Sequence, residues 1–475
     1  MSLLIPGTNS IKDTGYDVAN SLRFESAYLQ NPSSGASSSA ERKTLTWSIW
    51  LKRSELGATG STQYLASGRE SSGNYYIGIL FNSSDQLRVI QSAGGSTQMD
   101  LKTNRVFRDV SAWYHIVVAF DTTQGTSSNR VKIYVNGTQE TSFATETYPS
   151  QDLATYFGMT NSGDGYPTYI GSNTSAHFSG YMAEVVEVGG SQLTPTSFGE
   201  FDSDTPTVWK PKDLSDLSFG STAGANVYLD FEDSSDLGND ISGGNNDYSL
   251  NSIAATDQST DTCTNNFCTM NSSYPDGSIT FSEGNLKLTQ SSSSWRSAGG
   301  TIAVSTGKWY WETKTTGDYT FVGFADIQLF NEGCSVRESF TTGATTAATA
   351  FSLRNNDPRI HSVNTSGAQT VISDSTYSAS AFTSATIGIA LNLDDNEASW
   401  YINGTVQNSG TPLSISAGTY VPGISIYATN LELNFGSPPY SISSGNADAN
   451  GFGNFEYAVP SGYLALCTKN LAESG

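Results

Sequence analysis

The chain has 475 residues, of which 37% are hydrophobic and only 14% are charged, and its formal net charge at pH 7 is −22. This length exceeds the size at which one hydrophobic core keeps growing, so two or three domains are expected. The negative charge disfavours direct binding of nucleic acids and anionic membranes. The helix-forming residues Lys, Glu and Arg are scarce, whereas Gly, Ser, Thr and Asn are abundant, and this composition favours a β-rich protein.

Residues 1–20 are polar and turn-rich, and we expect them to form an N-terminal anchoring segment. A first domain is expected over residues 21–205, with short strands at 21–25, 45–51, 64–67, 75–81, 86–91, 99–101, 113–121, 130–135, 169–171 and 180–188. After the alternating strand at 131–135, Asn136-Gly137 supplies two residues that tolerate positive φ, as a type I′ hairpin requires. Short strands with Gly, Asn and Ser turns between them are typical of an antiparallel sandwich.

The second half of the chain repeats this pattern. Residues 206–277 are rich in Gly, Asn, Asp and Ser, and we expect an ordered linker with one or more strands, the first at 226–231. A second sandwich is expected over 278–437, with another hairpin at Asn403-Gly404, followed by a C-terminal segment at 438–475. The predicted fold class is therefore all-β: two antiparallel β-sandwich (jelly-roll) domains joined by an ordered linker.

Cysteine, histidine and the N-terminal residues narrow the protein classes further. Cys263 and Cys268 are close enough in sequence to bridge, and both a disulfide and two free thiols remain open. None of the three histidines lies at ligand spacing from a cysteine pair, so no zinc site is expected. Residues 1–7 lack the regions of a signal peptide, and no run approaches the ~20 apolar residues of a membrane span. We therefore expect synthesis in a cytoplasm and no membrane insertion.

An ordered set of motifs runs through residues 20–205: Leu22-Arg23-Phe24, Thr46-Trp47-Ser48-Ile49-Trp50, Trp113-Tyr114-His115-Ile116-Val117, Ile133-Tyr134-Val135-Asn136-Gly137, Tyr169-Ile170-Gly171 and Tyr181-Met182-Ala183-Glu184-Val185. This order resembles the laminin-G-like, concanavalin A-type lectin/glucanase superfamily. The resemblance implies a β-sandwich. It does not fix the ligand, because this superfamily includes lectins, enzymes and purely structural modules.

A second set spans residues 278–437: Gly307-Lys308-Trp309-Tyr310-Trp311-Glu312, Phe321-Val322-Gly323-Phe324, Ile387-Gly388-Ile389, the Asn403-Gly404 hairpin and Asn434-Phe435-Gly436. This order is similar to that of SPRY/B30.2 domains. The opening Leu4-Ile5-Pro6-Gly7-Thr8-Asn9-Ser10 and the closing Gly462-Tyr463-Leu464-Ala465-Leu466-Cys467 resemble the ends of marine tailed-phage fibre and adhesin-like proteins. That resemblance concerns architecture more than an active site.

Few residues suggest catalysis. A glycosidase needs two carboxylates that flank one bond, and the nearest approach to the superfamily's Glu-x-Asp-x-x-Glu pattern is Glu184-Val185-Val186-Glu187, which lacks the middle Asp. A spacing of three places Glu184 and Glu187 on opposite faces of a strand. His115 lies inside a strand and is expected to be a hydrogen-bonded sheet residue rather than a base. We therefore expect no enzymatic activity.

Two kinds of binding site are considered instead. Asp121, Asn161 and Asp164 offer hard oxygen ligands in turns and are candidate calcium ligands, with a simple turn at 161–165 as the alternative. Calcium is the only cofactor considered. Glycan recognition uses aromatic faces surrounded by hydrogen-bonding groups. The aromatic residues in or beside turn-rich segments, and hence the glycan-binding candidates, are Tyr75, Tyr76, Tyr166 and Trp295.

These observations favour a non-enzymatic structural protein of a phage virion, a tail fibre or adhesin, which presents its sandwiches to host-surface glycans. The partners expected are further copies of the chain, other virion proteins held by the N-terminal segment, and a glycan. Exposed strand edges favour a homo-oligomer, and the resemblance to phage fibres implies a trimer. The alternatives are a capsid decoration or head-fibre protein and a carbohydrate-active hydrolase.

Overall fold

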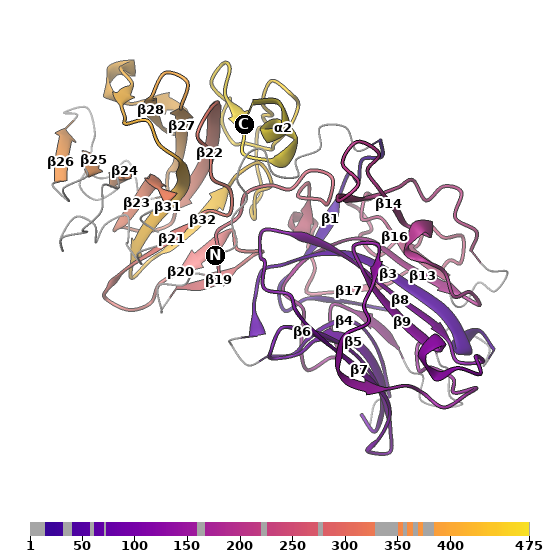
Figure 1. Cartoon of the computed structure of the whole chain (residues 1–475). Helices are drawn as coiled ribbons and strands as arrows, with labels where there is room; N and C mark the ends of the chain where they lie inside the picture. The colour runs from indigo at the N-terminus through magenta and orange to yellow at the C-terminus, as the bar shows by residue number, and fades with distance from the viewer. Residues whose placement is uncertain are drawn as a thin grey trace. The chain divides into compact units, whose positions relative to one another are not determined.

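The computed structural model describes residues 15–31, 40–57, 61–70, 73–158, 167–219, 226–273, 279–327, 350–354, 359–363, 369–373 and 384–474. The chain divides into two compact units (Figure 1). The first unit comprises Asp13–Arg108 and Ala112–Thr264, and the second is built mainly from Asn265–Gly475. Both consist of almost wholly antiparallel sheets, so the predicted all-β sandwich fold is confirmed.

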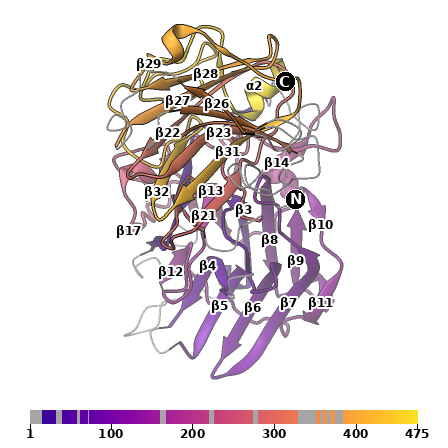
Figure 2. The same ribbon diagram turned by 90° about the vertical axis from the view of Figure 1, so that its left-hand side faces the viewer.

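Two sheets form the first unit. Sheet 1 contains, from edge to edge, β10 (Thr138–Gln139), β9 (Val131–Val135), β8 (Trp113–Asp121), β3 (Thr44–Arg53), β13 (Gly180–Gly189), β1 (Ser21–Phe24) and β18 (Gln258–Ser259), with β16 (Asn226–Leu229) also paired to β13. Sheet 2 contains β11 (Phe143–Thr147), β7 (Ser96–Val106), β6 (Gln86–Ala93), β5 (Tyr75–Phe81), β4 (Gln63–Arg69), β12 (Thr168–Ile170), β2 (Tyr28–Gln30) and β17 (Ser249–Asn251). Figure 2 shows β4, β5, β6 and β7 side by side.

The core of the first unit lies between these two sheets. Alternate residues of β9, including Ile133, join Trp47 of β3 on the inner face of sheet 1, and Ile77 and Val89 face them from sheet 2. The predicted hairpin is present, because Asn136 (φ 47°) and Gly137 (φ 76°) connect β9 to β10 with Thr138 paired to Val135. These buried side chains are β-branched or aromatic, and such residues favour strands over helices when they pack in a core.

The linker expected over 206–277 is divided between the two units: residues 206–264 belong to the first unit, and the residues from Asn265 onward belong to the second. Residues 206–264 contribute β16 and β18 to sheet 1 and β17 to sheet 2, and β14 (Gly199–Phe201) pairs with β15 (Trp209–Pro211). A second apolar layer covers the outer face of sheet 1, where Val186, Val188, Phe198 and Leu214 pack together. The strand expected at 226–231 is present as β16, whereas β17 and β18, which are only three and two residues long, were not expected.

A buried ion pair holds this covering segment to sheet 1. The Nζ of Lys52 lies 2.8 Å from Oδ2 of Asp261, and both side chains are only 1% exposed. The indole N–H of Trp113 donates to the other carboxylate oxygen of Asp261 over 3.2 Å. The lysine and the carboxylate are therefore shielded from water but paired with each other, and the carboxylate also accepts a hydrogen bond. A buried ion pair is tolerated only when its charges are paired and hydrogen-bonded in this way.

The second unit also contains two sheets. Sheet 3 has the order β19 (Thr280–Ser282), β20 (Lys287–Thr289), β32 (Asn430–Asn434), β22 (Lys308–Thr315), β27 (Thr386–Asn392), β28 (Glu397–Ile402) and β29 (Thr405–Val406), with β30 (Leu413–Ser414) on β28 and β33 (Leu464–Ala465) on β22. Sheet 4 has the order β21 (Trp295–Gly299), β31 (Tyr420–Tyr427), β23 (Thr320–Asp326), β24 (Ala350–Arg354), β25 (Arg359–Val363) and β26 (Gln369–Ser373).

The core between sheets 3 and 4 holds three tryptophans, Trp309, Trp311 and Trp400. The Asn403-Gly404 hairpin is also present, with φ values of 47° and 77° between β28 and β29. Among the described residues the one α-helix is α2 (Thr468–Ser474), and no helix there is long and apolar enough to cross a membrane.

One buried carboxylate fixes the C-terminal segment to the outer face of sheet 3. Glu312 accepts hydrogen bonds from the backbone N–H groups of Glu456 and Tyr457, both over 2.9 Å, and from the Tyr310 hydroxyl over 3.1 Å. Burial raises the pKa of Glu312, and these hydrogen bonds counteract part of that effect. Residues 438–474 are thus part of the second sandwich, where Phe455 packs against Tyr310.

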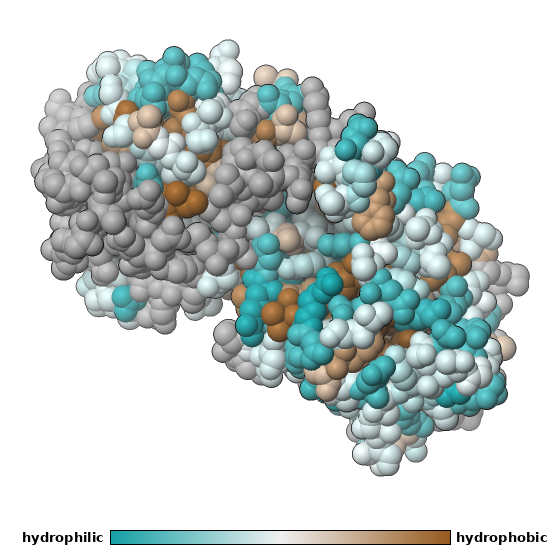
Figure 3. Space-filling model, viewed as in Figure 1, coloured by the Kyte–Doolittle hydropathy of each residue, from teal (hydrophilic) through white to brown (hydrophobic). Residues whose placement is uncertain are grey.

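Cys263, Cys268 and Cys467 are free thiols, which settles the open question of a bridge between the first two, and Cys334 lies outside the described residues. Hydrophilic and weakly polar residues dominate the face of the first unit drawn in Figure 3, with hydrophobic residues scattered between them.

Candidate functional site

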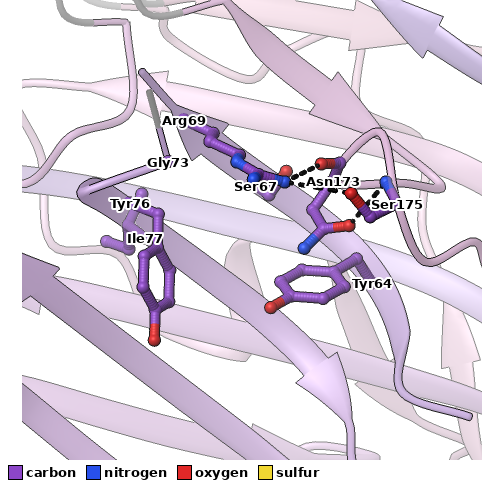
Figure 4. Close-up of a pocket in the computed structure, with 8 residues that line it drawn as sticks. All are labelled: Tyr64, Ser67, Arg69, Gly73, Tyr76, Ile77, Asn173 and Ser175. Carbon is purple, nitrogen blue, oxygen red and sulfur yellow. Dashed lines mark hydrogen bonds between the residues drawn. The ribbon is translucent and has the colours of Figure 1, made fainter. Parts of the chain in front are cut away.

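A cavity of about 270 Å³ opens on the outer face of sheet 2, across β4 and β5 and beside the loop that follows β12 (Figure 4). It is lined by two tyrosine rings, one guanidinium group and several small or amide side chains: Tyr64, Ser67, Arg69, Gly73, Tyr76, Ile77, Asn173 and Ser175. Its volume lies near the lower end of the range for small-molecule sites, which suits a ligand of one or two small rings.

The register of β4 against β5 explains which side chains reach this cavity. Arg69 pairs with Tyr76, and both side chains point away from the core that Ile77 joins. Simple alternation would place Tyr64 on the same face as Ala66, which is in the core. A register shift between Tyr64 and Ala66 turns the Tyr64 ring outward instead, as β-bulges do.

Gly78 provides the space that the Tyr64 ring occupies. A Cβ atom at Gly78 would lie only 2.6 Å from Cε1 of Tyr64, so the ring lies directly over this residue of β5. Figure 4 shows the rings of Tyr64 and Tyr76 on either side of an open space, with the Arg69 guanidinium above it in this view. Each of the two rings can offer a face against which a planar or ring-shaped ligand stacks.

The loop after β12 supplies the polar wall of the cavity. Ser67 donates its hydroxyl to the carbonyl of Ser172 over 2.7 Å, and Nη1 of Arg69 donates to the carbonyl of Asn173 over 2.9 Å. Oδ1 of Asn173 accepts the backbone N–H groups of Ser175 and Ala176, over 3.0 and 2.8 Å. With its oxygen engaged in this way, the Asn173 amide presents its N–H₂ group toward Tyr64 (Figure 4).

The charge and protonation of the cavity favour binding over proton transfer. Burial raises the pKa of Tyr64, with Arg69 acting in the opposite direction, so the hydroxyl is neutral at physiological pH. None of the described residues that line the cavity is a carboxylate or a histidine. The arrangement can stack against a ring, donate hydrogen bonds and hold a negative charge, but it offers no acid–base pair of the kind that hydrolysis needs.

The glycan-binding candidates predicted from the sequence do not come together. Tyr76 lines the cavity, but Tyr75 lies on the other face of β5, where it is 37% exposed and packs edge-on against Tyr156. Trp295 belongs to the second unit and is only 8% exposed, packed against Phe321 and other aromatic rings. Tyr166 lies outside the described residues.

The candidate calcium ligands can be followed only in part. Asp121 accepts hydrogen bonds from the N–H and hydroxyl of Thr123, over 3.1 and 2.6 Å, and from the Gln124 amide over 2.5 Å. Burial would raise the pKa of Asp121, but these hydrogen bonds outweigh it and lower the pKa. Asn161 and Asp164 lie outside the described residues, and no cluster of three or more His, Cys, Asp or Glu side chains that could hold a metal occurs within the described part of the chain. Calcium binding stays a prediction.

Glu184 and Glu187 lie on opposite faces of sheet 1. Glu184 adopts φ 48° at a bulge in β13 and accepts the Tyr228 hydroxyl over 2.7 Å within the outer layer. Burial raises its pKa to about 7. Glu187 follows Val186, which points outward, and its cross-strand neighbours Trp47 and Val227 belong to the core. The two carboxyl groups therefore cannot flank one substrate bond.

His115 is fully engaged in sheet 1. The Trp209 indole donates to Nδ1 over 2.9 Å, so the ring proton is on Nε2, which donates to the Ser48 hydroxyl over 2.8 Å. Burial lowers the pKa of His115 to about 3. This tautomer cannot accept the proton of Ser48, so the Ser48–His115 contact is a structural hydrogen bond rather than a nucleophile and its base.

Sequence reasoning missed Tyr64, Arg69 and Asn173. Tyr64 faces the cavity only because of the bulge, and Asn173 reaches it only because its loop folds back onto β4. The alternation of Arg69 and Tyr76 with core residues was the one available signal, since it places both on the outer face.

Comparisons with known proteins found one family match and several similar solved structures. The family model described as the concanavalin A-like lectin/glucanases superfamily matches residues 25–189, and no curated protein matches the chain. Similar solved structures include mouse laminin α1 chain domains LG4–5, 10% identical, with 91% of this chain and 92% of that chain covered and a TM-score of 0.28.

Two further solved structures cover less of this chain. The SPRY domain of human HERC1 is 13% identical, with 34% of this chain and 96% of that chain covered and a TM-score of 0.26. The heptameric SAP-like pentraxin from Limulus polyphemus is 13% identical, with 50% and 97% covered and a TM-score of 0.27. Residues 25–189 are thus similar to this superfamily, and their β-sandwich fold is compatible with carbohydrate binding or adhesion.

Proposed function

We propose that this chain is a non-enzymatic glycan-binding protein and that the cavity between Tyr64 and Tyr76 is its binding site. The observation that carries the proposal is the pairing of two outward tyrosine rings with the Asn173 amide and the Arg69 guanidinium in one cavity. A sugar ring presents apolar C–H faces, which stack on aromatic rings, and hydroxyl groups, which need donors and acceptors around them.

The wider biological role that we propose is attachment of a phage virion. The motifs at both ends of the chain resemble phage fibre and adhesin-like proteins, and two sandwich units with a hydroxyl- and amide-rich surface suit a projecting structural protein. In this role the chain is a homo-oligomer, with a trimer proposed from the same resemblance, and the first unit contacts host-surface glycans.

Removing either ring is expected to weaken glycan binding. A Tyr64→Ala or Tyr76→Ala variant loses one stacking face, and we expect the dissociation constant for the best ligand of a glycan array to rise at least tenfold, equivalent to ~1.4 kcal/mol. Tyr75→Ala is the matched control, because Tyr75 adjoins Tyr76 in sequence but lies on the other face of β5. Calorimetric titration of the purified full chain measures the three affinities.

Equal affinities for Tyr76→Ala and Tyr75→Ala would place the glycan elsewhere. The absence of any bound glycan on a broad array would remove the glycan-binding proposal altogether. Thermal unfolding of each variant verifies that a lost affinity does not reflect lost folding.

The location of the protein tests the virion role. We expect a cryo-EM map of the particle to show copies of the chain on the tail, with the first unit facing outward. Density on the capsid lattice instead would make it a decoration or head-fibre protein. Absence of the chain from any particle would contradict the virion role while leaving glycan binding to be judged by the titrations above.

A further inference from the structure

The polar wall of the cavity is a tight turn with a strained tip. The loop between β12 and β13 folds back on itself, with Ser172 paired to His177 and a backbone hydrogen bond of 3.1 Å from the Asn173 N–H to the Ala176 carbonyl. At its tip the exposed, β-branched Thr174 adopts φ 74°. A positive φ is strained for such a residue and persists only where the surrounding structure holds it.

Arg69 of β4 holds the tip of this loop from outside. Its Nη1 donates to the Asn173 carbonyl over 2.9 Å. The same nitrogen lies 3.4 Å from the hydroxyl oxygen of Thr174 and 3.3 Å from that of Ser175. One guanidinium nitrogen therefore contacts three consecutive residues of the strained turn.

The other edge of the Arg69 guanidinium faces the protein. Gly73 lies in the turn between β4 and β5, and a Cβ atom built on it would be 2.6 Å from Nη2 and 3.2 Å from Nε of Arg69. The Gly73 backbone, one bond from that position, therefore occupies the space in front of this edge and leaves no room there for a ligand carboxylate. Although a guanidinium can hold an anion, this one lies between two turns of its own chain.

The turn that Arg69 holds fixes the Asn173 amide beside Tyr64. Oδ1 of Asn173 accepts the backbone N–H groups of Ser175 and Ala176 over 3.0 and 2.8 Å, so the amide cannot turn over without losing both hydrogen bonds. Its N–H₂ group points toward Tyr64 (Figure 4). Burial raises the pKa of Tyr64, and the Asn173 amide, as a hydrogen-bond donor to the phenol oxygen, acts in the opposite direction. The Tyr64 hydroxyl can then donate its own proton to a ligand.

We infer that Arg69 is a positioning residue rather than a ligand contact, and that the cavity takes a neutral sugar. The sugar ring lies against Tyr64, and its oxygen atoms accept hydrogen bonds from the Tyr64 hydroxyl and the Asn173 amide. This inference rests on the proposed glycan-binding function and specifies its ligand class. The net charge of −22 favours the same class, because it repels acidic glycans at long range. A wall that is already in place reduces the conformational entropy lost on binding.

A double-mutant cycle tests whether Arg69 acts through Asn173. Cellotriose, galactotriose, mannotriose and chitotriose are titrated calorimetrically into the full-length protein, with trigalacturonate as the acidic comparison. Arg69→Met keeps the aliphatic stem but removes every donor, and we expect the dissociation constant of the best neutral probe to rise about tenfold, as in Asn173→Ala. The double variant is expected to bind no more weakly than Asn173→Ala, because no amide is left for Arg69 to position.

Hydrogen exchange of the free protein adds a readout that a ligand contact would not change. We expect the backbone N–H groups of Ser175 and Ala176, which are bonded to Asn173 in the native chain, to exchange faster in Arg69→Met. Mass spectrometry of a peptide that covers residues 172–178 measures this rate without any ligand.

Arg88→Met is the matched control for the loss of positive charge. Against the larger effect of burial, Arg88 lowers the pKa of Tyr64, as Arg69 does. The Arg88 guanidinium, however, donates two hydrogen bonds of 2.7 Å to Asp100. We therefore expect Arg88→Met to keep both the native affinity for the neutral probe and the native exchange rate of the loop.

The outcomes separate this inference from the proposed function. Losses that add up to about a hundredfold in the double variant would show that Arg69 contacts the ligand itself and overturn the inference. Trigalacturonate that binds more tightly than every neutral probe would also overturn it, and so would unchanged exchange in Arg69→Met. If the native chain binds none of the probes, the proposed function and the ligand class fall together, and faster exchange in Arg69→Met would then support the positioning role alone.

Discussion

The Glu187→Gln variant will gain stability relative to the native chain as the pH rises from 4.5 to 8. Glu187 lies in the core beside Trp47 and Val227, near the Tyr248 ring, and none of the described residues forms a hydrogen bond with its carboxyl group. Burial raises the pKa of Glu187 to about 8 from an ordinary value of 4.5. The folded chain therefore keeps a proton that the unfolded chain has already released.

The sign of the effect follows from that difference. The stability associated with protonated Glu187 is fully present below pH 4.5 and is lost as the pH rises to about 8. Each pH unit in this window lowers the free energy of unfolding by ~1.4 kcal/mol, so the total is on the order of 4 to 5 kcal/mol. Glutamine has nearly the same shape but does not ionise, so the variant lacks this loss.

Urea unfolding of the full chain at closely spaced pH values between 4 and 9 measures the difference between the variant and the native chain. Glu184→Gln provides a graded comparison, because the pKa of Glu184 is raised to about 7 and its window ends one unit earlier. A difference between Glu187→Gln and the native chain that stays constant from pH 4.5 to 8 would show that Glu187 ionises as it does in water.

Lys52→Met is expected to lower the free energy of unfolding of the native chain by ~3–5 kcal/mol at pH 7, because it leaves the Asp261 carboxylate buried without its cation. The exposed pair Lys43–Asp152, 3.1 Å apart with side chains 29% and 60% exposed, is the matched control. Lys43→Met should cost less than ~1 kcal/mol. Urea unfolding with both variants gives the two values.

A second substitution separates the charge from the packing. In Lys52→Met/Asp261→Asn the buried charge is removed and the Asn oxygen can still accept the Trp113 indole N–H. We expect the double variant to recover most of the loss, since a buried pair replaced as a whole costs little. A double variant as unstable as Lys52→Met alone would show that lost packing of the lysine stem, and not the unpaired carboxylate, is responsible.

The sequence predicted those parts of the fold that depend on local chemistry. The two Asn-Gly hairpins were foreseeable because few residues tolerate the two positive φ angles, and the inward tryptophans were foreseeable from strand alternation. The strand expected at 226–231 corresponds to β16, whereas β17 and β18 were not predicted, because each is only two or three residues long and gains its stability from strands far away in the chain.

The cavity was predicted less completely, for a comparable reason. Tyr76 was named because it adjoins a turn, but the same criterion selected Tyr75, which strand alternation sends to the other face. The outward Tyr64 depends on a bulge, and the Asn173 wall depends on hydrogen bonds between segments about 100 residues apart in sequence. Neither the bulge nor these long-range hydrogen bonds can be recognised from a few neighbouring residues of the sequence.

The strands β16, β17 and β18, which follow residue 189 in the chain, limit how the first unit can be exchanged between genes. A recombination event that transferred only residues 25–189, the extent of the family match, would leave behind β1, β16 and β18 of sheet 1 and β17 of sheet 2. The recipient would carry open strand edges and an uncovered layer at Val186 and Val188. Exchange that preserves folding must therefore include the chain from β1 as far as Thr264, so the exchangeable unit is longer than residues 25–189.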